Sequence, residues 1–337
     1  MNNHRRVSVV LLVCLVTTLL ALSAVPAEAR KGRGLHQGSR GHAVTLLETR
    51  LANLSLLTRS AVDRRYRAAT VNAVRAFQFQ MGLPRTGRVN RYLSARIARE
   101  PARRAGVKAP SVIGHRGAVG RSLAEDTLQS LQYAVPYADV LEFDLRLTSD
   151  RQYVLMHDYS LDRTTNCSGA VSSWSLEALR AQCTVSGQPI PTFDEAATFA
   201  AQVGKTIAPE LKDGWASTTD VQSVASTISS HGLTGRTWAQ SYYGSLLQTM
   251  RAQLPGVRTV LVSGGAPAPS IVKSVQADAV AAKLSSLTIP RVHAYHVAGI
   301  SVWGYTARST GEIQTARALV CDAVVTDTPR TARSIYR

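Results

Sequence analysis

Two carboxylates lie two residues apart in an otherwise apolar stretch, Val140 to Leu145. The stretch has the two-residue period of a β-strand, in which alternate side chains point to opposite faces. Glu142 and Asp144 therefore share one face of the predicted strand. Two carboxylates aimed at one point repel each other unless a cation lies between them, and a hard divalent ion fits best. The alternative is a polar strand edge that faces solvent.

A histidine reaches the same place from the next predicted strand. A turn at residues 149–151 precedes an apolar run at residues 153–156, which leads to His157 and Asp158. The two strands would form a hairpin, so the carboxylate pair and the histidine leave it together. A surface turn is the alternative interpretation of these two residues.

Short apolar strands alternate with helical patterns from residue 111 to the C-terminus. Eight such units predict a (β/α)₈ TIM barrel, with an open doubly wound sheet as the alternative. A barrel gathers the C-terminal ends of its strands around one mouth, where catalysis takes place. The residues predicted to lie at that mouth are His115, Arg116, Glu142, Asp144, Glu210, Lys212 and Trp303.

The three carboxylates of this set, Glu142, Asp144 and Glu210, would form an oxygen cage with room for substrate oxygens. Zinc suits such a site less well because its sites normally recruit nitrogen or sulfur ligands. The predicted cofactor is therefore one divalent cation, Ca²⁺ or Mg²⁺.

Cationic and imidazole side chains complete a set suited to a phosphate ester. Arg116 and Lys212 offer donors to the non-bridging oxygens of a phosphate. His115 and His157 can serve as general base and general acid for displacement at phosphorus. Each residue taken alone also fits a structural role. Their meeting at one mouth is what predicts cleavage of a phosphodiester.

The first 29 residues have the features of a signal peptide. Basic residues at 4–6 precede an apolar run at residues 7–22, and Ala27-Glu28-Ala29 is a small-residue cleavage site. Cleavage would leave Arg30 at the N-terminus of an exported protein. An uncleaved membrane anchor is the alternative. No later stretch predicts a membrane span.

Export allows disulfides to form. Cys167 and Cys183 flank one loop, and we predict that they pair, with free thiols as the alternative. Cys321 lies in an apolar stretch, which predicts a buried free thiol.

Nearly all of the excess positive charge lies in the first part of the chain. Residues 30–109 hold 18 lysines and arginines against three acidic residues, a net charge of +15. Residues 110–337 hold 19 against 18, a net charge of +1. A basic segment on an exported protein predicts an anionic surface as its partner. Export and the lack of interleaved aromatic residues argue against nucleic acid.

The basic segment has a helical pattern. Apolar residues recur at helical spacing near residues 44–54, and further helices are predicted at about 69–78 and 90–98. Thr70 is a candidate cap of the second helix. We predict a small three-helix bundle at residues 35–99, followed by a linker at residues 100–110 with proline near both ends.

This segment resembles the peptidoglycan-binding-domain-1 family over residues 35–99. The resemblance implies binding to cell-wall glycan or to its peptide stems, while the arginine-rich surface would equally suit an anionic wall polymer. The matching residues are Gly38, Gly41, Val44, Leu47, Leu51, Asp63, Tyr66, Thr70, Ala73, Val74, Phe77, Gln78, Gly82, Leu83 and Gly87.

Residues 111–329 resemble the glycerophosphodiester phosphodiesterase family. The resemblance implies metal binding by the three carboxylates, acid–base catalysis by the two histidines, phosphate contacts from Arg116 and Lys212, and release of glycerol 3-phosphate and an alcohol. Trp303 belongs to the same motif set and is expected to form a wall of the substrate site, with a place in the core as the alternative. The matching motifs are His115-Arg116-Gly117, Glu142-Phe143-Asp144, His157-Asp158, Leu161 to Thr165, Ile190 to Phe193, Glu210-Leu211-Lys212, Trp303 and Thr326-Asp327.

Two segments depart from that family. Ala124-Glu125-Asp126-Thr127 stands where Pro-Glu-Asn-Thr is usual, and Asp126-Thr127 is expected to cap the following helix all the same. Residues 303–306 read Trp-Gly-Tyr-Thr where Trp-Thr-x-Asn is usual, near the side of the leaving alcohol. The alcohol preference is therefore not carried over.

The sequence thus predicts a secreted, wall-associated, metal-dependent glycerophosphodiester phosphodiesterase, a barrel at residues 111–337 with a wall-binding module before it. Its substrate is expected to extend to glycerol-phosphate wall polymers. The alternatives are a phospholipase D-like enzyme acting on choline lipids and a non-catalytic wall-binding scaffold.

Overall fold

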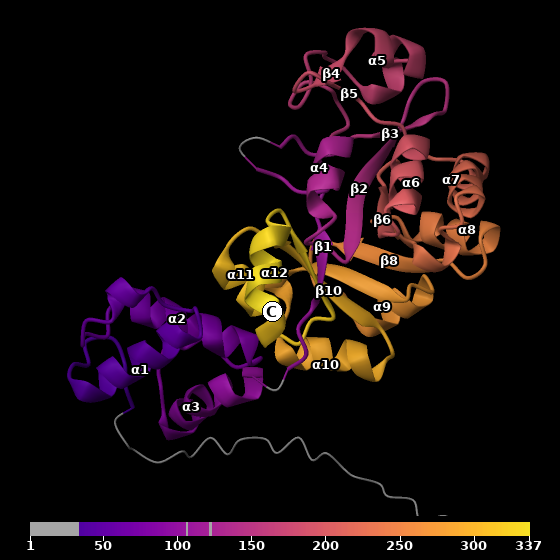
Figure 1. The fold of residues 1–337 in the computed structure, drawn as a ribbon. Helices are drawn as coiled ribbons and strands as arrows, with labels where there is room; N and C mark the ends of the chain where they lie inside the picture. The colour runs from indigo at the N-terminus through magenta and orange to yellow at the C-terminus, as the bar shows by residue number, and fades with distance from the viewer. Residues whose placement is uncertain (1–33, 106, 121–122) are drawn as a thin grey trace, which may run out of the picture. The chain divides into compact units, whose positions relative to one another are not determined.

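The computed structural model describes residues 34–105, 107–120 and 123–337 (Figure 1). The predicted signal peptide, residues 1–29, lies outside this part of the chain. No helix within the described residues is long and apolar enough to cross a membrane.

The N-terminal segment is a bundle of three α-helices, as predicted. Its apolar core contains Val44, Leu51, Phe77 and Ile97, all fully buried. The helical elements are α1 (His42–Asn53), the 3₁₀ turn η1 (Arg59–Ala61), α2 (Ala68–Gln80) and α3 (Arg91–Ala105).

Two local predictions for this bundle were wrong. Thr70 does not cap α2, which begins at Ala68; its hydroxyl donates instead to the buried Glu48 of α1 at 2.8 Å. The predicted linker begins inside α3, because the helix continues past Pro101 to Ala105. A proline removes one helical hydrogen bond without necessarily ending the helix, and buried Ile97 anchors the preceding turn.

The rest of the chain forms the predicted TIM barrel. The eight strands pair in parallel in the order β1-β11-β10-β9-β8-β7-β6-β2, and β1 also pairs with β2. This pairing closes the sheet and rules out the open doubly wound alternative. The strands are β1 (Ser111–Gly114), β2 (Val140–Leu147), β6 (Thr206–Leu211), β7 (Trp238–Ser241), β8 (Arg258–Ser263), β9 (Ala279–Lys283), β10 (Ser301–Ala307) and β11 (Ala323–Thr326).

Helices cover the outer face of the barrel (Figure 1). Leu141, Phe143 and Leu145 of β2 point outward into this layer, where Phe143 contacts Phe193 at a ring-centroid distance of 6.1 Å. The helical elements are α4 (Leu128–Ala134), α6 (Phe193–Gln202), α7 (Thr218–Ser230), η3 (Thr234–Arg236), α8 (Gly244–Gln253), α9 (Pro269–Ser274), η4 (Leu284–Ser286), α10 (Ile289–Val297), α11 (Thr310–Ala318) and α12 (Pro329–Tyr336).

A separate cluster of inward-facing side chains fills the barrel. Its members are mostly small or β-branched, as expected for the tapering interior of an eight-stranded barrel. Trp303 is the largest of them, and its ring lies edge-on to that of Trp238 at 5.2 Å. The buried members are Ile113, Val140, Ala208, Val260, Val262, Ala279, Ala281, Trp303, Ala323 and Val325.

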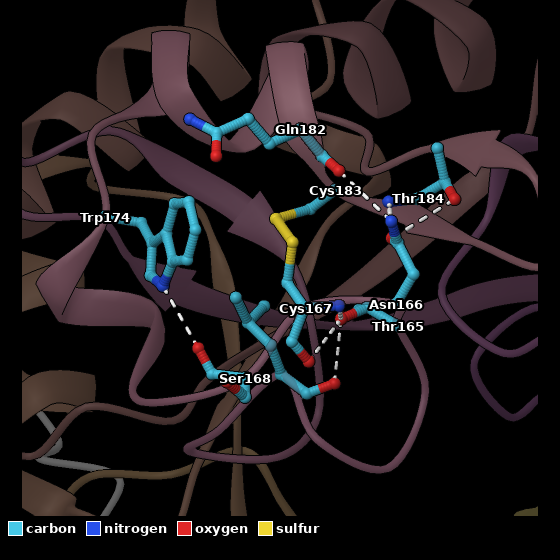
Figure 2. The surroundings of a disulfide bond; sticks show 9 residues. Thr165, Asn166, Cys167, Ser168, Trp174, Gln182, Cys183 and Thr184 are labelled. Carbon is cyan, nitrogen blue, oxygen red and sulfur yellow. Dashed lines mark hydrogen bonds between the residues drawn. A yellow bond between two sulfur atoms is a disulfide. The ribbon is translucent and has the colours of Figure 1, made fainter.

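An excursion between β2 and α6 lies beside the barrel. Strand β3 (Tyr153–Leu155) runs antiparallel to β2, and the chain then forms η2 (Val171–Ser173), α5 (Leu176–Gln182), β4 (Thr184–Val185) and β5 (Gln188–Pro189). Figure 2 shows that Cys167 and Cys183 form the predicted disulfide. Asn166 reinforces this closure, since it bonds to the backbone on both sides of Cys183. Cys321 is a buried free thiol, also as predicted.

Replacing Cys167 and Cys183 together with serine is expected to lower the free energy of unfolding by about 3 kcal/mol, because the bridge closes a loop of roughly 15 residues. Thermal unfolding with and without reductant measures the effect. Reductant should lower the midpoint of the wild type and leave the double variant unchanged. Equal midpoints for the oxidised wild type and the double variant would contradict this prediction.

Candidate active site

The register of two neighbouring strands brings the three predicted carboxylates together. Glu142 and Asp144 follow inward-facing Val140 on β2, and Asp144 pairs directly with Glu210 of β6. Each side chain offers an oxygen within 4.8 Å of the others, and all three residues are buried. The strand period and the parallel register therefore produce the cluster.

Two cations lie against these carboxylates, as the sequence predicts. Lys212 Nζ lies 3.0 Å from Glu210 Oε1 and 3.3 Å from Asp144 Oδ1. Arg116 Nε lies 3.2 Å from Asp144 Oδ2, and the Arg116 backbone N–H donates to Glu142 Oε2 at 2.6 Å. Arg116 and Lys212 thus border the cluster and can also face a bound phosphate.

Burial and mutual repulsion decide which carboxylates of the cluster ionise. Burial, and then the charge of Asp144, raises the pKa of Glu142 well above its usual range. The same causes raise the pKa of Glu210 to about 7. Burial alone would also raise the pKa of Asp144, but Lys212 and Arg116 outweigh burial and lower it. Asp144 is thus held ionised, while Glu142 and Glu210 resist ionisation.

These residues fit a divalent cation. Asp144 Oδ2 is buried, and although Arg116 Nε lies 3.2 Å away, this oxygen accepts no hydrogen bond within the described part of the chain. Three clustered carboxylates supply the hard oxygen donors that Ca²⁺ and Mg²⁺ prefer. Glu142, Asp144 and Glu210 could therefore hold such an ion, with Ca²⁺ and Mg²⁺ equally compatible with the donor set.

The affinity of this site for Ca²⁺ or Mg²⁺ is expected to fall as the pH drops through about 7. Glu210 has a raised pKa of about 7 in the metal-free protein, so below that pH it must release a proton before it can bind the cation. Calorimetric titrations at pH 6 and pH 8 in buffers of different ionisation enthalpy measure both affinity and proton release. Equal affinities without proton release would contradict the prediction.

The first predicted histidine is held by a partner far away in the sequence. His115 Nδ1 lies 2.5 Å from Asp327 Oδ1, at the end of β11. Asp327 Oδ2 accepts from Arg308 Nε at 2.8 Å. Burial alone would raise the pKa of Asp327, but the hydrogen bond and charge of His115 outweigh burial and lower it. This pairing leaves His115 Nε2 as the nitrogen free to act in the cavity.

The second predicted histidine has a matching carboxylate. His157 Nδ1 lies 2.6 Å from Asp158 Oδ1, and Arg163 Nε donates to Asp158 Oδ2 at 2.5 Å. Burial, reinforced by the charges of Lys212 and Arg116, lowers the pKa of His157 despite the opposing charge of Asp144. His157 is thus biased towards its neutral form.

Glu125 links the two halves of the site. It accepts from Arg116 Nη1 at 2.7 Å and from Arg163 at 2.5 Å, so it fixes one cation that faces the cluster and another that orients Asp158. Of the pair Asp126-Thr127 that was predicted to cap α4, only Thr127 does so. Asp126 Oδ1 accepts from the backbone N–H of Asp144, while Thr127 caps the helix in a capping box with Ser130.

A tight turn after β1 places His115 and Arg116. Gly117 has a φ of +80°, and a Cβ there would lie 2.5 Å from Ser130 Oγ and 2.6 Å from the Ser130 backbone carbon. Only glycine fits this contact without displacing α4. The motif His115-Arg116-Gly117 therefore combines two functional side chains with the residue that lets the backbone turn beneath them.

A cavity of about 410 Å³ opens at the C-terminal ends of the strands. His115, Arg116, Glu142, His157, Glu210 and Lys212 all line it. Six of the eight residues predicted from sequence thus meet at one cavity, and Asp144 lies buried beside them.

Trp303 is the exception. It is only 3% exposed within the barrel core and is not among the described residues that line the cavity. Its predicted place at the mouth requires the strand to end at about residue 303, but β10 continues to Ala307. Tyr305, which points to the same face two residues later, lines the cavity instead. Sequence reasoning also missed Tyr242, Lys283 and Arg308 in this lining.

The fold and the site together define a TIM-barrel hydrolase with a cationic, carboxylate-bearing mouth. The chain belongs to the glycerophosphoryl diester phosphodiesterase family, whose sequence model matches residues 115–331. It is accordingly a glycerophosphodiester phosphodiesterase, a hydrolase of phosphoric diesters. A model of a peptidoglycan binding domain matches residues 40–96. Both family resemblances are thereby confirmed.

Individual relatives agree with this assignment. A Bacillus subtilis (strain 168) protein with the name "Putative glycerophosphodiester phosphodiesterase YhdW" is 28% identical over 232 residues, which cover 65% of this chain and 94% of that protein. The glycerophosphodiester phosphodiesterase of Caldanaerobacter subterraneus subsp. tengcongensis is 32% identical over 111 residues, 31% of this chain and 45% of that protein. An Oleispira antarctica phosphodiesterase solved with the product sn-glycerol-3-phosphate has the same fold, with a TM-score of 0.62, 24% identity and coverage of 67% and 96%.

Proposed function

We propose that this chain is a secreted, wall-associated enzyme that uses Ca²⁺ or Mg²⁺ to hydrolyse glycerophosphodiesters to glycerol 3-phosphate and an alcohol. The observation that carries the proposal is one cavity lined by two of the three clustered carboxylates, two cationic side chains and two histidines, each histidine held by its own aspartate. This set matches the needs of phosphodiester cleavage, which are charge neutralisation, orientation and proton transfer.

Glu142, Asp144 and Glu210 would hold the metal ion. When bound, the ion polarises the phosphoryl group and stabilises the charge that develops on its oxygens. Arg116 and Lys212 lie beside the same carboxylates and donate to the non-bridging oxygens, so they fix the phosphate in one orientation.

The two histidines divide the proton transfers. The lowered pKa of His157 favours the neutral imidazole, which suits a general base. His157 would take the proton either from an attacking water or from a substrate hydroxyl that first forms a cyclic phosphate, which water then opens. His115 takes the complementary role and delivers a proton to the oxygen of the leaving alcohol. Asp327 acts as a positioning residue, because its contact with Nδ1 directs Nε2 of His115 into the cavity.

Replacing Asp327 with asparagine is expected to lower kcat roughly 10²–10⁴-fold with little change in KM, because the wrong tautomer of His115 would face the substrate. Steady-state kinetics on glycerophosphoglycerol provide the measurement. An Asp327→Glu variant, which retains a carboxylate, should recover part of kcat. A change in KM alone would show that Asp327 does not orient His115 for catalysis.

Wall association rests on the helical module. Its peptidoglycan binding match and its net charge of +15 over residues 30–109 support binding to glycan or to an anionic wall polymer. Tethering would raise the local concentration of the barrel near wall-borne substrates. Glycerol-phosphate wall polymers therefore join small deacylated lipids as proposed substrates. Cosedimentation with purified cell walls tests the tether. The full chain should sediment with the walls, and a variant that lacks residues 35–99 should not.

Product analysis tests the chemistry. The mature protein is expected to release glycerol 3-phosphate from glycerophosphocholine and from purified glycerol-phosphate wall polymer. A phospholipase D-like enzyme would instead release choline from lysophosphatidylcholine and leave a phosphorylated lipid. Wall binding without turnover of any of these substrates would favour the scaffold alternative. The proposed polymer activity fails if only the small diester is cleaved.

A further inference from the structure

A second cationic group lies in the cavity, away from the carboxylates. Lys283 ends β9, and its side chain follows Ala279 and Ala281, both of which face the barrel interior. The two-residue period therefore turns Lys283 inward at the mouth, and it lines the cavity. Within the described residues it has no ion-pair partner.

Arg308 is the second cation of this group. It directly follows β10, whose Tyr305 pairs with Lys283, and it lines the same cavity. Its Nε donates to Asp327 Oδ2, while its two terminal nitrogens make no hydrogen bond within the described residues. The guanidinium is therefore anchored at one atom and still has donors to offer.

The strand order places these cations across the mouth from the carboxylates. In the closed barrel, β9 lies four strands from β2 in either direction, and β10 lies four strands from β6 in either direction. Lys283 is thus diametrically opposite Glu142 and Asp144, while Arg308 follows the strand opposite β6 and is held by Asp327, the residue after β11. One cavity has two cationic regions, and the predicted metal site belongs to only one of them.

The wall between the two regions suits an uncharged, hydroxylated spacer. Tyr242 and Tyr305 hydrogen-bond to each other through their hydroxyls at 2.8 Å, and Gln240 and Ser285 also line the cavity. Glu312 is the acidic residue on the far side, but its Oε2 accepts from two backbone N–H groups at the start of α11. That capping role draws its charge towards the helix N-terminus.

We propose that Lys283 and Arg308 form a subsite for a second phosphate group, carried on the alcohol side of the scissile diester. This inference rests on the proposed function, because it takes the first phosphate to lie at Arg116 and Lys212. The chemical class that fits is a glycerol-phosphate chain with at least two consecutive phosphates. The polar spacer between them would cross the cavity along Tyr242 and Tyr305.

Two synthetic substrates that differ by one phosphate test this subsite. The first is glycerophosphoglycerol, and the second is the same molecule with a phosphate on its terminal hydroxyl. The wild type is expected to prefer the second in kcat/KM, and Lys283→Gln should reduce that preference roughly ten- to a hundredfold, as expected for hydrogen bonds to a charged group. Arg308 is a poorer test because its loss would also disturb Asp327 and His115.

The matched control is Lys273→Gln, which removes an exposed lysine at the end of α9 and should leave the preference unchanged. An equal preference in wild type and Lys283→Gln would overturn the subsite even if both substrates are cleaved.

Binding measurements test the subsite independently of substrate turnover. Calorimetry with His157→Ala and Ca²⁺ compares the dissociation constants of the two intact substrates, with and without Lys283→Gln. Tighter binding of the bisphosphate that depends on Lys283 supports the subsite even if the wild type cleaves neither substrate, in which case only the proposed function fails. Equal dissociation constants would overturn the subsite.

Discussion

Replacing His157 with alanine is expected to lower kcat on glycerophosphocholine by roughly 10²–10⁴-fold, the usual contribution of a positioned general base. His157 lines the cavity, its Nδ1 is held by Asp158, and its lowered pKa keeps it neutral. The loss should lie mainly in kcat, because Arg116 and Lys212 still bind the phosphate. Release of glycerol 3-phosphate under saturating substrate measures it.

His231→Ala is the matched control. His231 also pairs with an aspartate, Asp194 at 2.9 Å, but it lies at the end of α7 and does not line the cavity. Its replacement should leave kcat unchanged. If both variants lose activity to the same degree, or if His157→Ala retains full kcat, His157 is not the base.

Replacing Glu142 with glutamine is expected to weaken Ca²⁺ or Mg²⁺ binding by at least about a hundredfold, and activity should fall with it. The change keeps the shape of the side chain but removes one of three clustered charges, and ligand charge count sets the affinity of such sites. Even residues outside the first coordination shell typically contribute 10- to 100-fold. Calorimetric titration with each metal provides the measurement.

The same change should leave the thermal midpoint of the metal-free protein nearly unaltered, because the raised pKa of Glu142 already keeps that side chain largely neutral there. Glu177→Gln, an exposed position on α5, is the control and should affect neither quantity. Unchanged metal affinity in Glu142→Gln would show that the cation binds elsewhere.

The carboxylate cluster could be predicted because its signal is local. Alternation along one strand puts Glu142 and Asp144 on one face, and a TIM barrel then brings Glu210 beside them. The same reasoning failed for Trp303 because it misjudged where β10 ends, and strand ends depend on pairing with neighbours. The alternation of Ala279, Ala281 and Lys283 is an equally local signal, but Lys283 belongs to no family motif.

Contacts between residues far apart in the chain could not be predicted from the sequence alone. His115 and Asp327 are 212 positions apart and meet only because β1 and β11 are neighbours in the closed barrel. Thr70 was expected to cap a helix because threonine favours that position. Its hydroxyl instead donates to Glu48, a buried carboxylate that is costly to leave without hydrogen-bond donors. Asp126 likewise bonds to the backbone of β2 rather than capping α4. For Thr70 and Asp126, a tertiary contact overrode a local preference for the helix cap.

The most direct test of the central claim is release of glycerol 3-phosphate from glycerophosphocholine by the mature protein with Ca²⁺, with Mg²⁺ and with chelator, beside a His115→Ala variant. We expect turnover with at least one metal, its loss in chelator, its return when metal is restored, and a large loss of kcat in the variant. Full activity in chelator, or undiminished activity of His115→Ala, would contradict a metal-dependent phosphodiesterase built on this cavity.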